Sequence, residues 1–147
     1  MRRWALLLAF LTCTLFGVPA RAAQVEVLRQ TGQADKRFNI AVLGDGYRAE
    51  DQALLSQHAK AIVDYLFRIS PLRQYQQFFN VKLVHVISNE NGADNGSYGE
   101  TRDTALDALF DCEGIDRLLC VDDGKAQAAA ALDVPEYNFA LVLVNDP

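Results

Sequence analysis

The sequence predicts an α/β fold of three layers, in which helices cover both faces of a largely parallel sheet. Residues 38–43 and 139–144 are mostly apolar runs without a charged side chain, as is typical of strands buried on both faces. A third run, residues 79–88, alternates in character and places Phe79, Val81 and Leu83 on one face. The segments between these runs are long enough to hold helices, and parallel strands require crossovers of that length.

The first half of the chain supports this order of elements. Residues 23–36 contain many polar side chains and are broken by Thr31-Gly32, so they predict an N-terminal strand or arm. The turn Gly44-Asp45-Gly46 closes the first buried strand and leads into a helix over residues 49–67, which Ser70-Pro71 ends. The apolar positions of this helix recur at alternating intervals of four and three residues: Leu55, Ala59, Ile62, Leu66 and Ile69.

The second half alternates loops with shorter elements. Residues 89–99 are rich in glycine and asparagine and predict a loop. Residues 101–110 are compatible with a helix, and the alanine-rich residues 125–132 favour one. Residues 72–78 could form a short helix. The pattern of residues 114–121 does not distinguish between a strand and a turn.

The chain begins with the features of a cleavable signal peptide. Met1-Arg2-Arg3 is basic, residues 4–18 are uncharged and mostly apolar, and Ala20-Arg21-Ala22 offers a small-x-small cleavage site. As a helix the apolar run would span roughly 22 Å, less than the ~30 Å hydrocarbon core, so it predicts no permanent membrane anchor. We therefore expect residues 1–22 to be removed and the protein to be secreted or periplasmic.

The charge balance argues against two classes of partner. The chain has 14 basic and 19 acidic residues, a formal net charge of −5 at pH 7. The leader contributes three arginines and no acid, so the exported part is more acidic still. Nucleic acids and anionic membranes select positive surfaces, and we expect neither as a partner.

The cysteines predict a disulfide in the exported part. Cys112 and Cys120 remain after removal of the leader, an even number in an oxidising compartment. Their separation requires a bend in the chain, which Gly114 can supply. Two unrelated buried thiols are the alternative, and two cysteines alone provide only half of the ligands of a zinc site. Cys13 lies in the leader behind Thr12 rather than a small residue, so we do not expect lipid attachment there.

The turn after the first strand is the first candidate for a site. Loops at the carboxyl ends of strands hold ligands in α/β folds, and Asp45 and Tyr47 stand in such a loop. Ala49 occupies the third glycine position of G-x-G-x-x-G, and we do not expect dinucleotide binding in an exported protein. Gly46 replaces the nucleophilic serine of a Gly-Asp-Ser esterase block. Two interpretations stay open: a tight turn that needs a positive φ, or contact of Asp45 and Tyr47 with a substrate or partner.

The second candidate is the loop after residues 79–88. Glu90 and Asp94 lie there among amides and glycine, whose oxygens could bind calcium or could simply form a solvated turn. The chain has two histidines, His58 and His85, on different predicted elements, and neither belongs to an H-E-x-x-H zinc motif. We expect both histidines to be core or boundary residues rather than metal ligands.

Three blocks of the sequence, taken in order, resemble one family. The first is F-N-I-A-V-L-G-D-G-Y at residues 38–47, before the long helix. The second joins Phe79-Asn80-Val81 to S-N-E-N-G-A-D at residues 88–94. The third is G-I-D-R-L-L at residues 114–119, followed by L-V-L-V-N-D-P at residues 141–147. Together they resemble the IgA-peptidase family of secreted zinc metallopeptidases over residues 37–147, with Asn91 where a serine is expected.

The resemblance implies a partial zincin-like metallopeptidase domain at residues 37–147. In that family the zinc-binding H-E-x-x-H helix follows the Val-Asn-Asp strand, so the zinc ligands and the general-base glutamate are expected beyond Pro147. No residue of this chain matches a catalytic or zinc position, so we expect the chain by itself to be inactive and to hold no cofactor. The apolar strand at residues 139–144, which only three residues follow, also predicts a truncated chain.

The same resemblance implies a function for the whole protein. It implies a secreted zinc-dependent endopeptidase that hydrolyses peptide bonds in protein or peptide substrates. This chain would be the N-terminal scaffold, supplying the sheet on which the active-site helix packs. The alternative is a non-catalytic exported α/β domain whose loops at residues 44–47 and 89–94 bind a ligand or partner. Resemblance at the level of fold does not identify the substrate.

Overall fold

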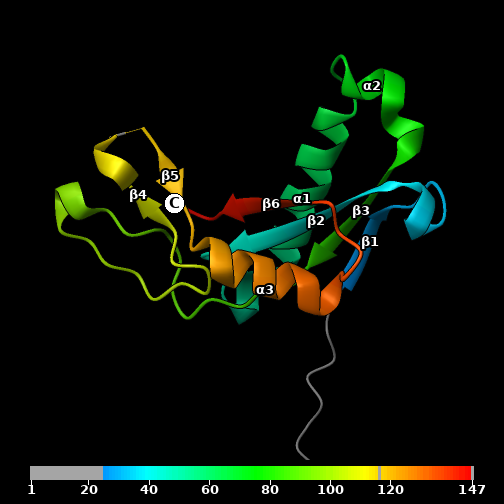
Figure 1. Ribbon diagram of the computed structural model, residues 1–147. Coiled ribbons are helices and arrows are strands. Elements are labelled where there is room, and N and C mark those ends of the chain that lie inside the picture. Colours follow the sequence, from blue (N-terminus) through cyan, green and yellow to red (C-terminus); the bar gives the residue numbers. More distant parts are fainter. Residues whose placement is uncertain (1–24, 116, 147) are drawn as a thin grey trace, which may run out of the picture.

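The computed structural model describes residues 25–115 and 117–146, so the predicted leader, residues 1–22, lies outside the described residues. In this part the chain forms a four-stranded sheet, a two-stranded hairpin and the helices that connect them (Figure 1). The strands and α-helices are β1 (Val25–Arg29), β2 (Phe38–Asp45), α1 (Gln52–Leu66), α2 (Leu72–Tyr75), β3 (Phe79–Val84), β4 (Leu109–Phe110), β5 (Leu119–Cys120), α3 (Asp123–Asp133) and β6 (Phe139–Val144). Short 3₁₀ helices lie between them: η1 (Ala34–Lys36), η2 (Ala49–Asp51), η3 (Gln76–Phe78), η4 (Gly96–Tyr98) and η5 (Cys112–Gly114).

The sheet is largely parallel, as predicted. Its strand order is β1-β3-β2-β6, and β2 runs parallel to both of its neighbours. β1 pairs antiparallel with the outer side of β3. The connections from β2 to β3 and from β3 to β6 contain α1 and α3, which are the crossovers that parallel pairing requires.

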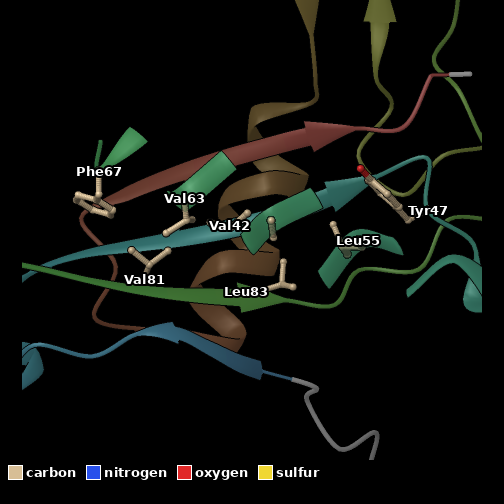
Figure 2. Packing of buried hydrophobic residues seen from close by; sticks show 8 residues of the cluster. Val42, Tyr47, Leu55, Val63, Phe67, Val81 and Leu83 are labelled. Carbon is tan, nitrogen blue, oxygen red and sulfur yellow. The ribbon is translucent and has the colours of Figure 1, made fainter. Parts of the chain in front are cut away.

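The two longer helices cover opposite faces of the sheet (Figure 1). Figure 2 shows Leu55 and Val63 of α1 lying against Val42, Val81 and Leu83 of the sheet. Leu55 and Ala59 are buried, as predicted for the apolar face of this helix. The third buried residue of α1 is Val63, whereas Ile62 and Leu66 are half-buried and Ile69 lies beyond the end of α1 and is exposed. The other face is covered by α3 through small side chains, Ala126 and Ala130, which pack near Ala41, Leu43 and Val84.

The structure corrects the helix predicted at residues 101–110. This segment is an irregular loop that ends in β4. Its backbone N–H groups at Leu106 and Ala108 donate to the Asp45 carboxylate, and Asp107 adopts a left-handed φ of 52°. A helix would need those N–H groups for its own carbonyls, so the contact with Asp45 excludes it.

The other elements differ from the predictions mainly at their ends. The strand expected at residues 79–88 stops at Val84, and beyond it the N–H of Ser88 donates to the carbonyl of Tyr47 in the turn that follows β2. Residues 114–121, left open between strand and turn, contain the short strand β5. The predictions of an N-terminal strand and of a strand at residues 139–144 are confirmed as β1 and β6. Among the described residues, no helix is both long enough and apolar enough to cross a membrane.

Candidate functional site

The carboxyl ends of β2 and β6 lie side by side and form the candidate site. Asp45 at the end of β2 pairs with Val144 at the end of β6. Beyond the strands, the side-chain amide of Asn145 donates to the carbonyl of Gly46, and the N–H of Gly92 donates to the carbonyl of Asn145. Three segments that are far apart in the sequence therefore meet at this edge of the sheet.

Asp45 anchors a loop at this edge. Its side chain is fully buried and accepts four hydrogen bonds, from Ser88 Oγ (3.0 Å), Thr104 Oγ1 (2.9 Å) and the N–H groups of Leu106 (3.0 Å) and Ala108 (2.9 Å). A buried carboxylate is tolerated only when its oxygens have such partners. Asp45 thus holds residues 88–108 against the sheet, and in this structure it has no exposed surface for the contact with a substrate that the sequence suggested.

Gly46 confirms the prediction of a tight turn. Its φ is +71°, and a Cβ at this position would stand 2.7 Å from the carbonyl oxygen of Gly92. Only glycine combines this backbone conformation with so close an approach of another segment. The hydroxyl of Ser88 completes the turn by accepting the N–H groups of Gly46 and Ala105, each at 3.0 Å.

Tyr47 and His58 form a polar pair beside an apolar hollow. The Tyr47 side chain is almost completely buried, and its hydroxyl lies 2.8 Å from Nδ1 of His58 on α1. Burial raises the pKa of Tyr47, so the hydroxyl keeps its proton at neutral pH. The adjoining hollow measures about 400 Å³ and is lined by Tyr47, His58, Ala61, Ile62, Leu143 and Val144. Tyr47 therefore borders this hollow although its side chain is almost completely buried.

A second hollow, of about 570 Å³, is polar. It is lined by Arg48, Asn89, Glu90, Asn91, Gly92, Glu100, Arg102 and Asp146. Both arginines are already paired, Arg48 with Glu50 (3.0 Å) and Arg102 with Glu100 (3.4 Å). The structure places Glu90 at this hollow, where its Oε2 also accepts the N–H of Asp103 (2.7 Å). Asp94 does not line it.

The candidate acid Asp94 supports the loop instead. One of its carboxylate oxygens accepts the N–H of Arg102, and its own N–H donates to the carbonyl of Ala108 (2.7 Å). Both contacts are within the loop that Asp45 anchors. Among the described residues, no group of three or more His, Cys, Asp or Glu side chains lies close enough to hold a metal ion.

Sequence reasoning missed the role of Asn91. Its side-chain amide donates to the carbonyl of Gly46 (2.9 Å) and to Oδ2 of Asp51 (2.7 Å), so it ties the loop to the start of α1. The hydrogen bond from Asn91, helped by Arg48, holds the pKa of Asp51 below its usual range. The one signal in the sequence was that asparagine stands here where the resembled family is expected to have serine.

The histidines and cysteines of the described part do not fit a zinc site. His58 bonds to Tyr47, whereas Nδ1 of His85 lies 2.9 Å from Oε1 of Gln52. Cys112 and Cys120 are joined in a disulfide, with their Cα atoms 6.1 Å apart.

The chain resembles a known protein family over most of its length. The sequence profile of the family described as IgA Peptidase M64 matches residues 25–147. The match begins with β1 and includes the whole sheet, both covering helices and every segment of the candidate site. No curated protein matches the chain.

Proposed function

This chain belongs to the IgA peptidase M64 family, and from that membership we propose that it is the N-terminal scaffold of a secreted, zinc-dependent endopeptidase. The observation that carries the proposal is the extent of the match, residues 25–147, which spans a folded scaffold rather than one short motif. A peptidase acts on peptide bonds, so its substrates would be proteins or peptides.

The zinc ligands belong, on this proposal, to a helix encoded beyond Pro147. Among the described residues, no group of three or more His, Cys, Asp or Glu side chains could hold the metal. Zinc, when bound, would lower the pKa of a water molecule and polarise the peptide carbonyl. The residues of this chain would act only by positioning.

The apolar hollow beside Tyr47 is where we place that helix. Its walls come from α1, through Ala61 and Ile62, and from β6, through Leu143 and Val144. Leu54 and Tyr65, which also belong to α1, are exposed. Contiguous exposed apolar surface marks a place where further protein packs. A helix beside α1 would bury the hollow and would begin close to the end of β6.

The Asp45 network would support this arrangement. Asp45 fixes residues 88–108, and Gly92 in that loop bonds to Asn145 just after β6. The direction in which the chain leaves β6 therefore depends on the loop. The network is expected to set where the following segment starts and not to take part in bond cleavage.

The experiment compares residues 23–147 with a product of the same gene that continues through an H-E-x-x-H motif. We expect the longer product to contain stoichiometric zinc by mass spectrometry, to cleave an unstructured protein such as casein, and to lose both properties to a chelator. The matched control replaces the glutamate of that motif by glutamine, which should abolish cleavage and retain zinc. Stoichiometric zinc or chelator-sensitive cleavage from the shorter product would overturn the proposal. A stop codon directly after Pro147 would favour a non-catalytic binding domain instead.

Secretion has its own test. The exported protein is expected to begin at Ala23 or Gln24, because Ala20-Arg21-Ala22 follows the apolar run. Amino-terminal sequencing of secreted material would show this. Material that begins at Met1, or that carries lipid on Cys13, would contradict it.

A further inference from the structure

Glu26, in the N-terminal strand β1, meets three side chains from two other segments. Its Oε1 lies 2.6 Å from Nζ of Lys60, and its Oε2 accepts the hydroxyl of Ser56 at 2.7 Å. Nε2 of His85 lies 3.6 Å from the same Oε2. Lys60 and Ser56 belong to α1, and His85 directly follows β3. This cluster joins β1 to the rest of the molecule, and the proposed function does not use it.

The hydrogen bonds of Gln52 determine which nitrogen of His85 carries the proton. Nε2 of Gln52 faces three carbonyl oxygens, those of Tyr47 (3.2 Å), Arg48 (3.1 Å) and Val86 (3.1 Å). The amide nitrogen must point at these acceptors, which leaves Oε1 facing Nδ1 of His85 at 2.9 Å. An amide oxygen only accepts, so Nδ1 of His85 is protonated. The neutral ring therefore presents a bare Nε2 to the carboxylate of Glu26.

Two acceptors enclose the ring, and only a doubly protonated ring satisfies both. The side chain of His85 is 12% exposed, so water can replace few of its contacts. When Nε2 gains a proton, the ring still donates to Gln52 through Nδ1 and carries a positive charge 3.6 Å from Oε2 of Glu26, so the contact with Glu26 becomes an ion pair. Without that proton, a lone pair faces a carboxylate. Histidine is the side chain that ordinarily changes charge between pH 5 and 8.

Glu26 remains an anion over that range. The hydrogen bonds from Lys60 and then Ser56 hold the pKa of Glu26 below its usual value. Among the residues that the structure describes, the charged groups facing the ring are Glu26 from β1 and, on the far side of that carboxylate, Lys60 from α1. Lys60 competes for the anion at Oε1, whereas His85 approaches Oε2, so the two cations can share it.

We propose that His85 and Glu26 form a pH-sensitive clasp, which fastens β1 to α1 and β3 more tightly as the pH falls from about 8 to about 6. Gln52 extends the clasp, because the same amide that orients His85 binds the carbonyls of Tyr47 and Arg48. Acidification therefore steadies the N-terminal strand and, through Gln52, the turn at the candidate site.

Hydrogen exchange of the β1 amides tests the clasp. Protection of residues 25–29, corrected for intrinsic exchange, should rise about fivefold from pH 8 to pH 6, the size expected for one partly exposed ion pair. His85→Gln should abolish the rise. His58→Gln, which changes the other histidine of the chain, should retain it. An absent rise in the unaltered protein, or an equal rise in His85→Gln, would overturn the proposal.

Two further measurements keep the test decisive if His85→Gln folds poorly. Glu26→Gln removes the anion but keeps the histidine, and the rise should disappear in this variant too; its persistence would overturn the proposal. Nitrogen NMR of the His85 ring at alkaline pH should show the proton on Nδ1. A neutral ring protonated on Nε2 would contradict the geometry on which the clasp rests.

Discussion

β2 and β6 are neighbouring strands of similar apolar sequence, yet they lie in different environments. They pair in parallel over six residues, from Ile40 with Phe139 to Asp45 with Val144. In β2, Val42 and Leu43 are fully buried, whereas residues 140–144 of β6 are only half-buried and Phe139 is 52% exposed. The reason is position: β2 has strands on both sides, whereas β6 pairs only with β2 among the described strands. An apolar run thus indicates that the side chains of a strand are to be buried, but it does not show which other residues bury them.

The largest difference between the two strands is expected in the free energy of unfolding when residues at their carboxyl ends are substituted. Asp45→Ala would leave Ser88, Thr104 and two backbone N–H groups without their acceptor, at a cost of about 3–5 kcal/mol in the free energy of unfolding. Asp146, which follows β6, is exposed, and Asp146→Ala should cost less than about 0.5 kcal/mol. Urea unfolding of the exported chain measures both. Equal losses would show that Asp45 is not an anchor.

A matched leucine in each strand sharpens the comparison. Leu43→Ala should lower the free energy of unfolding by about 3–4 kcal/mol, because the side chain is fully enclosed and a cavity would remain. Leu143→Ala should cost about 1 kcal/mol, since Leu143 is only half-buried beside the apolar hollow.

The same pair tests the proposed place of the zinc-binding helix. In a product extended through that helix, the cost of Leu143→Ala should rise towards that of Leu43→Ala, while the cost of Leu43→Ala should not change. A cost at Leu143 that is the same in both products would place the helix elsewhere.

The two edges of the sheet should differ in their tendency to associate. β1 carries Glu26 and Arg29 and a register irregularity between Val27 and Arg29, features that discourage pairing with another chain. β6 has no charged residue. We expect the exported chain to self-associate, and Phe139→Lys to weaken association about tenfold by adding charge at that edge.

The control for this edge is Val27→Lys on β1, where a further charge beside Glu26 and Arg29 should change association little. Analytical ultracentrifugation measures both variants. A monomeric chain that melts cooperatively above about 50 °C would show that β6 needs no further cover, and would favour the non-catalytic binding domain.

The smallest effect is expected from an ion pair that crosses β2. The ammonium of Lys82 on β3 pairs with the carboxylate of Glu136, which precedes β6. β2 lies between these two strands, and its Ala41 pairs with Lys82 on one side and with Ala140 on the other. The Lys82 ammonium lowers the pKa of Glu136. The pair therefore stabilises the fold above the ordinary pKa of glutamate, and its contribution is lost as the pH falls through the lowered value.

Glu136→Gln should cost about 0.5–1 kcal/mol at pH 7 and almost nothing near pH 3, because the pair is partly exposed. Glu113→Gln, at an exposed position in η5, serves as the control and should have little effect at either pH. A difference between Glu136→Gln and the unaltered protein that is independent of pH would show that the pair contributes no charge interaction.

The clearest failure of sequence-based prediction lies in residues 101–110. Leu106 and Leu109 have a spacing that a helix permits, and nothing nearby argues against one. The competing partner is Asp45, which precedes this segment by about sixty residues and takes its N–H groups. A pattern read within a short window contains no information about an acceptor so far away.

Local features of the sequence were sufficient for several conclusions. The apolar runs predicted β2 and β6, and the Gly-Asp-Gly turn predicted the positive φ of Gly46. The helical period predicted Leu55 and Ala59 among the α1 residues that pack on the sheet, but it did not predict Val63. The ordered blocks predicted the family, which the profile match confirms. Each of these properties depends on backbone preferences or on residues close together in the chain.

Tertiary structure alone decided how the side chains are paired. Asp45 became a buried anchor rather than an exposed contact, Tyr47 met His58, and Glu26 met His85. The sequence determined which strands form and that they are apolar. The full burial of β2 and the partial exposure of β6 follow from the strand order of the sheet. Hydrogen bonds and burial act through distance in space, and only the fold sets that distance for residues far apart in the chain.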